Sequence, residues 1–200
     1  MTSVSATTTE LDEVGVALVE AAATLLATEG PQALTVRRIA AEAGVSTMNV
    51  YSRFGSKDGV VEHLYVRGFE LLAASQREAG VTGDPILDWK RTAQAYRRFA
   101  LDHATMYGVM FERSVPDFEP SPEAVRAGLA TLDHLARRLE RAMDAGVMRR
   151  MEPLHAAAVV WATCHGVMSL ELRHRISDTL DWAQVFDDAC DALMRGLAPQ

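Results

Sequence analysis

The hydrophobic and polar positions of this 200-residue chain repeat almost throughout with the spacing of an α-helix. Apolar side chains recur every three or four residues, and alternating apolar and polar runs of the kind that mark half-buried strands are missing. Glycine, proline and short polar residues divide the pattern into nine segments. The expected helices cover residues 10–29, 35–43, 46–54, 56–78, 84–101, 103–112, 121–145, 153–175 and 181–197. The chain is therefore expected to fold as an all-α protein.

The most informative stretch covers residues 35–57, TVRRIAAEAGVSTMNVYSRFGSK. Thr35 is a natural N-cap for a first short helix, and Gly44 ends that helix because glycine adopts the left-handed conformation without steric cost. Ser46 then caps a second short helix, whose Phe54 faces inward. Helix, glycine turn and capped helix are the plan of a helix-turn-helix unit, whose second helix enters the major groove of DNA. An ordinary corner between two packed helices is the alternative.

Charge favours the DNA-binding interpretation of this stretch. The whole chain has a formal net charge of −7, but here Arg37, Arg38, Arg53 and Lys57 oppose only Glu42. So negative a chain does not suit a non-specific coat on nucleic acid. It suits a specific DNA-binding protein that concentrates its positive charge on one small face. Lys57 also stands where the next helix begins, and the free N–H groups of a helix N-terminus attract phosphate.

The same stretch resembles the DNA-binding domain of the TetR/AcrR family of tetracycline-repressor-like regulators. The family elements T-x-R-x-I-A, G-V-S, V-Y-x-x-F and S-K all occur here at the family spacing. Gly55, Gly59 and Arg53 depart from the pattern, and a glycine inside a helix costs about 1 kcal/mol relative to alanine. A second segment, WATCHGVMSLEL at residues 161–172, resembles the C-terminal domain type of this family that is marked by a tryptophan and a His-Gly pair, the WHG type.

The resemblance implies two domains and a link between them. Residues 10–56 would form the N-terminal helix-turn-helix domain, and residues 57–200 a C-terminal helical domain for ligand binding and dimerisation. The long helix over residues 56–78 would connect the two mechanically. Residues 1–9 are rich in serine, threonine and alanine, and we expect them to form a disordered tail.

Phosphate contacts follow from the resemblance. It assigns them to Thr35, Tyr51 and Lys57, whose hydroxyl, phenol and ammonium groups suit the role. Arg53 is a further candidate because a guanidinium pairs well with phosphate. The full set of expected DNA-contacting residues is Thr35, Arg37, Ser46, Thr47, Met48, Asn49, Tyr51, Arg53 and Lys57.

Base contacts are expected from the start of the second short helix. Asn49 could form two hydrogen bonds to an adenine, and Met48 could cover a thymine methyl group. Arg37, on the first short helix, could bind a guanine. For Arg38, a place on a solvated helix face is as compatible with the pattern as a DNA contact.

The last two expected helices need a further surface to pack against. The segment 153–175 is apolar on nearly all sides, and such a helix is buried on more than one side. The resemblance implies a homodimer in which two helices of each chain form a four-helix bundle, and packing within one chain is the alternative. Two-fold symmetry would then require a pseudo-palindromic operator. The expected interface residues are Trp161, Cys164, Met168, Trp182, Phe186, Ala189 and Leu193.

Aromatic, methionine and histidine residues gather in the middle of the chain and suggest a ligand pocket. In family members, the domain beyond the linking helix encloses a small molecule, and aromatic and methionine side chains suit an apolar or aromatic effector. The candidate ligand-binding residues are Trp89, Tyr96, Phe99, His103, Met106, Tyr107, Met110, Phe111, Trp161, His165 and Met168. A plain hydrophobic core is the alternative, with His103 and His165 in buried hydrogen bonds.

Other chemistry is weakly supported. Cys164 and Cys190 fall on apolar helix faces, which favours reduced buried thiols over a redox switch. The histidines lack the spacing of a metal site, and the motifs of hydrolases, phosphate-binding loops and dinucleotide-binding folds are missing. We therefore expect no metal, no cofactor and no enzymatic activity. Without a signal peptide or an apolar segment that could span a membrane, a cytoplasmic protein is expected.

The sequence thus predicts a homodimeric regulator that binds double-stranded DNA at a palindromic operator. It is expected to act as a repressor that a small effector releases from DNA. The competing interpretation is a dimeric protein that binds a small molecule and has no DNA-binding activity.

Overall fold

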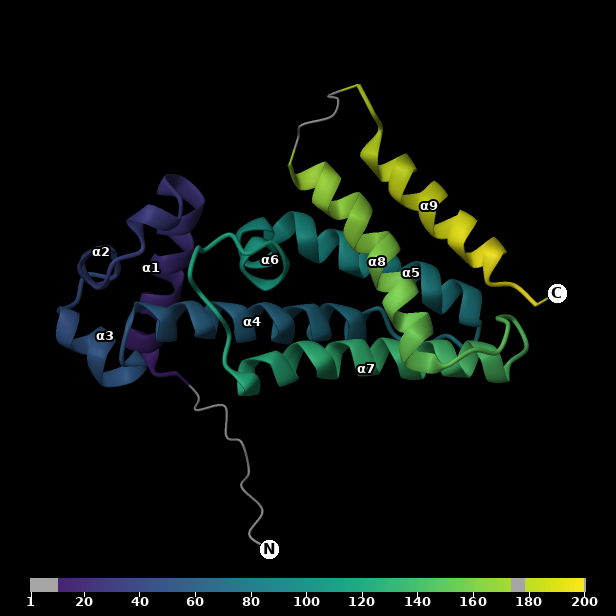
Figure 1. Ribbon diagram of the computed structural model, residues 1–200, viewed down its shortest axis with the longest axis horizontal. Coiled ribbons are helices and arrows are strands. Elements are labelled where there is room, and N and C mark those ends of the chain that lie inside the picture. Colours follow the sequence, from purple (N-terminus) through teal and green to yellow (C-terminus); the bar gives the residue numbers. More distant parts are fainter. Residues whose placement is uncertain (1–10, 174–178, 200) are drawn as a thin grey trace, which may run out of the picture.

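The computed structural model describes residues 11–173 and 179–199, and this part of the chain contains helices and no strand (Figure 1). The expected tail over residues 1–9 and the expected helix end near residue 175 lie outside the described residues. The helices are α1 (Glu13–Glu29), η1 (Pro31–Ala33), α2 (Val36–Glu42), α3 (Thr47–Phe54), α4 (Lys57–Glu78), α5 (Pro85–Asp102), α6 (Ala104–Phe111), α7 (Pro122–Asp144), α8 (Pro153–Leu172) and α9 (Trp182–Gly196). The all-α prediction is confirmed, and only the short 3₁₀-helix η1 was not expected.

Local capping chemistry explains why these boundaries follow the sequence closely. The carboxylate of Asp84 accepts hydrogen bonds from two backbone N–H groups at the start of α5, and the hydroxyl of Ser121 accepts one at the start of α7. Gly44 ends the first short helix with φ of +68°, the left-handed conformation expected of it. Ser46 does occupy the N-cap of α3, but its hydroxyl accepts from the side chain of Asn49 and not from the backbone.

The helices α1, η1, α2 and α3 form a compact unit at one end of the molecule. Helices α1, α2 and α3 pack on one another, and α4 leaves this unit to run among α5, α6 and α7 (Figure 1). A Cβ atom on Gly59 would lie 2.0 Å from the carbonyl oxygen of Phe54. The glycine is therefore required where α4 crosses the end of α3, and it is not merely a weak point of the helix. This close approach fixes α4 to the helix that precedes it.

The remaining helices surround the far half of α4. Helix α7 lies alongside α4 and α8, and α9 packs on α8 at the end of the molecule opposite α2 and α3 (Figure 1). One continuous cluster of buried apolar side chains extends from Leu18 in α1 to Leu197 after α9. The unit formed by α1, α2 and α3 and the rest of the chain thus share a core. None of the described helices is long and apolar enough to cross a membrane.

Candidate nucleic-acid interface and ligand cavity

Helix α3 presents a largely exposed face to solvent. Val50 and Phe54 are buried and hold the helix on the unit, whereas Met48 is 70% exposed and Tyr51 is 55% exposed. Thr47 beside them is exposed as well. Met48 and Tyr51 are three residues apart and therefore lie on the same face of α3. Of the side chains on α3 expected to read DNA bases, Thr47 and Met48 are therefore exposed and Asn49 is half-buried.

Helix α2 and the start of α4 border this surface. Thr35 accepts a hydrogen bond from the backbone of Arg38 at 3.2 Å, so its own hydroxyl hydrogen stays available. Arg37 is exposed and has no ion pair among the described residues. The Nζ atom of Lys57 lies 2.8 Å from Asp58 at the first turn of α4. Arg38, unlike Arg37, forms an ion pair with Glu29. For Arg38 this favours a place on a solvated helix face over a DNA contact.

A side-chain network fixes Arg53 and Asn49 in place. Arg53 donates to both carboxylate oxygens of Asp12, at 2.9 and 2.7 Å, and to the side-chain oxygen of Asn49 at 2.8 Å. Asn49 in turn donates to Ser46 at 3.1 Å. The hydrogen bond from Arg53 lowers the pKa of Asp12 to about 2, so that carboxylate is ionised at neutral pH. The guanidinium expected to contact phosphate is thus engaged within the chain.

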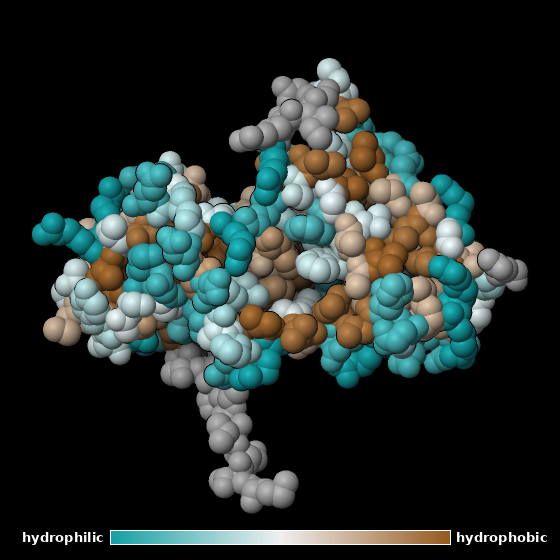
Figure 2. Space-filling model, viewed as in Figure 1, coloured by the Kyte–Doolittle hydropathy of each residue, from teal (hydrophilic) through white to brown (hydrophobic). Residues whose placement is uncertain are grey.

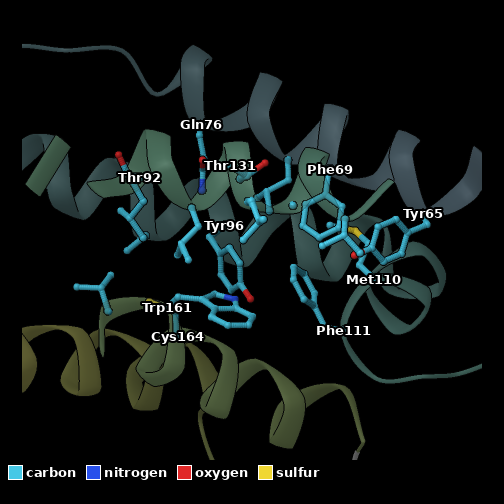
Figure 3. Close-up of a pocket in the computed structure, with 18 of the residues that line it drawn as sticks. Tyr65, Phe69, Gln76, Thr92, Tyr96, Met110, Phe111, Thr131, Trp161 and Cys164 are labelled. Atoms are coloured by element: carbon cyan, nitrogen blue, oxygen red, sulfur yellow. The ribbon is translucent and has the colours of Figure 1, made fainter. Parts of the chain in front are cut away.

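A cavity of about 240 Å³ lies between α4, α5, α6, α7 and α8 (Figure 3). Gln76 and Thr92 stand at one end of it, and Tyr65 and Met110 at the other. The lining residues are Tyr65, Phe69, Leu72, Gln76, Trp89, Thr92, Ala93, Tyr96, Met110, Phe111, Val125, Gly128, Leu129, Thr131, Leu132, Leu135, Val160, Trp161 and Cys164. Its walls are therefore largely apolar and rich in aromatic rings, as in many sites for small molecules.

Part of the expected ligand-binding set lines this cavity. The five residues that do so are Trp89, Tyr96, Met110, Phe111 and Trp161. Six others do not line it: Phe99, His103, Met106, Tyr107, His165 and Met168. Met168 and Phe99 are buried in the core, and the ring of His103 packs against Phe99. These six residues lie outside the cavity wall. Helical spacing alone does not distinguish a cavity wall from its supporting layer.

Tyr107 and His165 support the cavity from behind. The hydroxyl of Tyr96, a lining residue, lies 3.0 Å from that of Tyr107, which lies 2.6 Å from Nδ1 of His165. Burial raises the pKa of both tyrosines and lowers the pKa of His165. The hydrogen-bonded chain is therefore neutral near pH 7 and holds Tyr96 in a fixed orientation. The contact of His165 with Tyr107 is thus a partly buried hydrogen bond, the kind of role that was the alternative for this residue.

The sequence interpretation missed the cavity walls formed by α4 and α7. The apolar stripe of α7 looked like ordinary core, yet Leu129 is 56% exposed and lies at the cavity. Figure 2 shows hydrophobic side chains along α7 and over α8 and α9 on this face of the molecule. Gly128 was the available signal, since a Cβ atom there would lie 2.9 Å from the ring of Phe69. A glycine within an apolar helical stripe marks such a close approach.

The expected interface residues divide into three groups. Met168, Phe186 and Cys164 are buried within the single chain, where Cys164 lies 3.9 Å from Cys190 between the two sulfur atoms. They pack α8 on α9 and offer no free surface to a partner. Trp161 lines the cavity, and the other three expected residues, Trp182, Ala189 and Leu193, are half-buried on α9.

Helix α8 exposes a different set of residues from the one expected. Its outward face repeats every fourth residue and carries small or apolar side chains. This exposed stripe consists of Leu154, Ala158, Ala162, Gly166 and Leu170. A stripe without charged side chains is a surface that water solvates poorly.

Solved structures with the same fold are known. A protein of unknown function from Rhodococcus sp. RHA1 is 26% identical, with a TM-score of 0.81, and the alignment covers 96% of this chain and 100% of that one. The TetR-family regulator PfmR from Thermus thermophilus is 22% identical, with a TM-score of 0.70 and coverage of 91% and 99%. A putative fatty acid metabolism regulator from Clostridium perfringens is 18% identical, with a TM-score of 0.73 and coverage of 92% and 100%. The last two show the fold alone.

Curated proteins provide no match to this chain. Two family models do match it. The model described as "Bacterial regulatory proteins, tetR family" matches residues 18–64, which include the helix-turn-helix stretch. The model described as "Tetracyclin repressor-like, C-terminal domain" matches residues 89–193, more than half of the chain, and that segment covers α6, α7 and α8 and most of α5 and α9. The chain therefore belongs to the TetR family of bacterial transcriptional regulators.

Proposed function

We propose that this TetR-family regulator is a repressor that binds a pseudo-palindromic operator as a homodimer and leaves it when a small effector enters the cavity. The observation that carries the proposal is the exposed face of α3. It presents Met48 and Tyr51 to solvent on the helix that a helix-turn-helix unit inserts into the major groove. Positive charge lies beside it at Arg37 and Lys57, although the chain as a whole is acidic.

The proposed contacts follow the chemistry of each exposed group. Thr35, Tyr51 and Lys57 hold phosphates and set the orientation of the unit on the duplex. Arg37 binds a guanine, and Met48 covers a thymine methyl group. Asn49 reads an adenine edge, with its side chain aligned by Ser46 and Arg53.

The homodimer is supported by the exposed stripe of α8. Small residues such as Ala158, Ala162 and Gly166 allow a second helix to approach closely, and Leu154 and Leu170 would lose their contact with water at the ends. Burial of this apolar surface favours association. A two-fold axis through α8 would place one α3 on each side and so require two half-sites in the operator.

Helix α4 provides the physical link between the cavity and the DNA-reading unit. Phe69 and Gln76 on α4 line the cavity, while Gly59 at its other end lies against the backbone of Phe54 in α3. A ligand that prefers a shifted position of α4 therefore also favours a shifted α3. Such a ligand lowers operator affinity to the extent that it binds the shifted state more tightly.

The test is selection of DNA fragments from the source genome by purified full-length protein, followed by a salt series. The matched control is the double variant Arg37→Ala, Tyr51→Ala, which alters only exposed residues. Selection of one palindromic sequence by the wild-type chain alone supports the proposal. Weak binding without sequence preference that disappears with salt would refute it and favour a dimeric ligand-binding protein without an operator.

A further inference from the structure

The cavity contains chemistry that narrows the class of its ligand. We infer that it binds an uncharged, mainly apolar molecule with one polar end that both donates and accepts a hydrogen bond, as an alcohol, a phenol or a primary amide does. The inference rests on the proposed function in that it takes this cavity as the effector site. Three features carry it: the lining, two buried polar atoms without partners, and the volume.

The lining excludes a charged ligand body. All of the lining residues are uncharged in the part of the chain that the structure describes. A carboxylate or an ammonium group in such a site would lose its hydration without gaining a counter-charge, which is costly. Phe69, Phe111 and Trp161 instead offer rings to an apolar or aromatic body.

Two lining side chains each have a buried polar atom that lacks a partner within the described residues. Gln76 is 5% exposed and its side-chain carbonyl oxygen has no donor, while Trp89 is 6% exposed and its indole N–H has no acceptor. Gln76 projects from α4 toward the space enclosed by the helices (Figure 3). Buried polar groups are normally paired, so these two atoms point to a group that the ligand supplies.

The two unpaired atoms are complementary in kind. Gln76 requires a donor and Trp89 requires an acceptor, and a hydroxyl or a primary amide provides both. An ionised carboxylate provides acceptors only, so it could accept from the indole N–H of Trp89 or the amide N–H of Gln76 but would leave the carbonyl oxygen of Gln76 without a donor. We expect pairing of the two atoms together to raise ligand affinity roughly tenfold.

The positive charge of Arg138 would favour an anionic ligand, but its guanidinium is engaged by groups within the chain. Its guanidinium donates to the hydroxyl of Thr92 at 2.6 Å and to the backbone carbonyl of Gln76 at 3.0 Å. Arg138 lines a neighbouring cavity of about 220 Å³ and does not line the first one. Because Thr92 borders both cavities, a carboxylate in the first cavity would meet its side chain and not the guanidinium.

The volume sets the size of the ligand. A cavity of roughly 150 Å³ with apolar walls holds one benzene molecule. The present cavity of about 240 Å³ scales to roughly ten non-hydrogen atoms on that basis. An aromatic ring with a three-carbon chain and a polar end has this size.

The experiment compares matched probes by calorimetry on the full chain. The probes are hydrocinnamyl alcohol, hydrocinnamamide, hydrocinnamate, phenylpropylamine and propylbenzene, which share one body and differ in the end group. We expect the alcohol and the amide to bind at least roughly tenfold more tightly than the two charged probes and than propylbenzene. Hydrocinnamate as the tightest probe, equal affinity for all five, or no binding of the neutral probes to folded protein would overturn the inference.

Variants of the lining identify the atoms responsible. Gln76→Leu, which removes an unpaired polar group, should stay folded and lose the roughly tenfold advantage of the alcohol over propylbenzene. Trp89→Phe should reduce that advantage in the same way. Thr131→Val is the control because the hydroxyl of Thr131 already donates to the backbone of Ala127, and it should keep the advantage. If Gln76→Leu keeps it as well, the assignment of Gln76 is wrong.

DNA selection with the same protein separates this inference from the proposed function. A chain that selects an operator but ignores the neutral probes contradicts the ligand class alone. A chain that ranks the probes as expected but selects no operator contradicts the regulator proposal alone.

Discussion

At the scale of single residues, Arg53 is the side chain that sequence and structure interpret most differently. The sequence suggests a phosphate contact, whereas in the structure its guanidinium is shared between Asp12 and Asn49. Asp12 lies 41 residues earlier in the chain and at the N-cap of α1, so no local pattern could indicate the pair. Thr35 and Gly44, by contrast, carry their signals locally, and the turn between α2 and α3 could be predicted almost to the residue.

The hydrogen bonds from Arg53 to Asp12 and Asn49 predict that Arg53 aligns Asn49 for base reading. Arg53→Ala should lower affinity for the selected operator roughly tenfold while affinity for random DNA changes little, because a misplaced Asn49 loses its base contact. The slope of log affinity against log salt should stay unchanged. A lost phosphate contact would instead reduce that slope by about 0.9 and weaken binding to all sequences alike.

Asp12→Asn is the second variant of this test, because asparagine still caps α1 but no longer carries the charge that attracts Arg53. It should weaken operator binding in the same direction as Arg53→Ala. Stronger binding would contradict the alignment role, since it would mean that Asp12 withholds Arg53 from phosphate.

The pKa of Asp12 is lowered from 3.8 to about 2, so the stabilisation by the pair is complete above pH 4 and disappears as the pH falls toward 2.

Gly59 gives a stability prediction at the same scale. Gly59→Ala should destabilise the chain by about 3 kcal/mol, because its Cβ atom would overlap the backbone carbonyl of Phe54, which cannot move aside as a flexible side chain could. Urea unfolding followed by circular dichroism measures the change. The control on the same helix is Arg67→Ala, at an exposed position, and it should shift the midpoint little. Equal stability of wild type and Gly59→Ala would contradict the close approach.

At the scale of helices, the cavity shows what the sequence can and cannot reveal. Aromatic side chains on α5, α6 and α8 were recognisable as candidates, and those such as Tyr96 and Trp161 do line the cavity. Apart from the signal of Gly128, the walls from α4 and α7 were not recognisable, because a stripe of leucines is typical of core until the packing of other helices leaves space beside it. An empty volume arises from how helices pack together, and single-helix periodicity carries no information about it.

The hydrogen bond between Tyr107 on α6 and His165 on α8 predicts that the folded chain loses stability in acid. Burial lowers the pKa of His165 below its usual value of 6.5, with Glu112 opposing and Arg173 reinforcing the shift. The unfolded chain therefore takes up this proton first as the pH falls, and stability present above pH 6.5 is lost as the pH falls through the lowered pKa. His165→Gln should make the loss of melting temperature between pH 7.5 and 5.5 smaller.

His134 keeps part of the acid sensitivity in that variant, because burial lowers its pKa too. The control is His155→Gln, at an exposed position on α8, and it should retain the wild-type dependence. Identical pH profiles for wild type and His165→Gln would show that the hydrogen bond to Tyr107 is not maintained by a neutral imidazole.

At the scale of the whole molecule, the exposed stripe of α8 predicts a dimer. Ala162→Glu would place a carboxylate in the middle of that stripe, where a partner helix would strip it of water. Sedimentation should show a folded monomer for this variant and a dimer for wild type. Ala130→Glu, an equivalent change on the exposed face of α7, should stay dimeric. A wild-type chain that sediments as a monomer at micromolar concentration would refute the assignment.

The most direct test of the whole account is the ratio of specific to non-specific DNA affinity at one fixed salt concentration. It compares the selected fragment with a scrambled fragment of equal length by fluorescence anisotropy. An operator-binding regulator should show a ratio of at least about 10³, with two chains bound to each fragment. The Arg37→Ala, Tyr51→Ala variant should lose most of that ratio. A ratio near one for the wild-type chain would contradict the central claim, because the exposed face of α3 would then carry no sequence information.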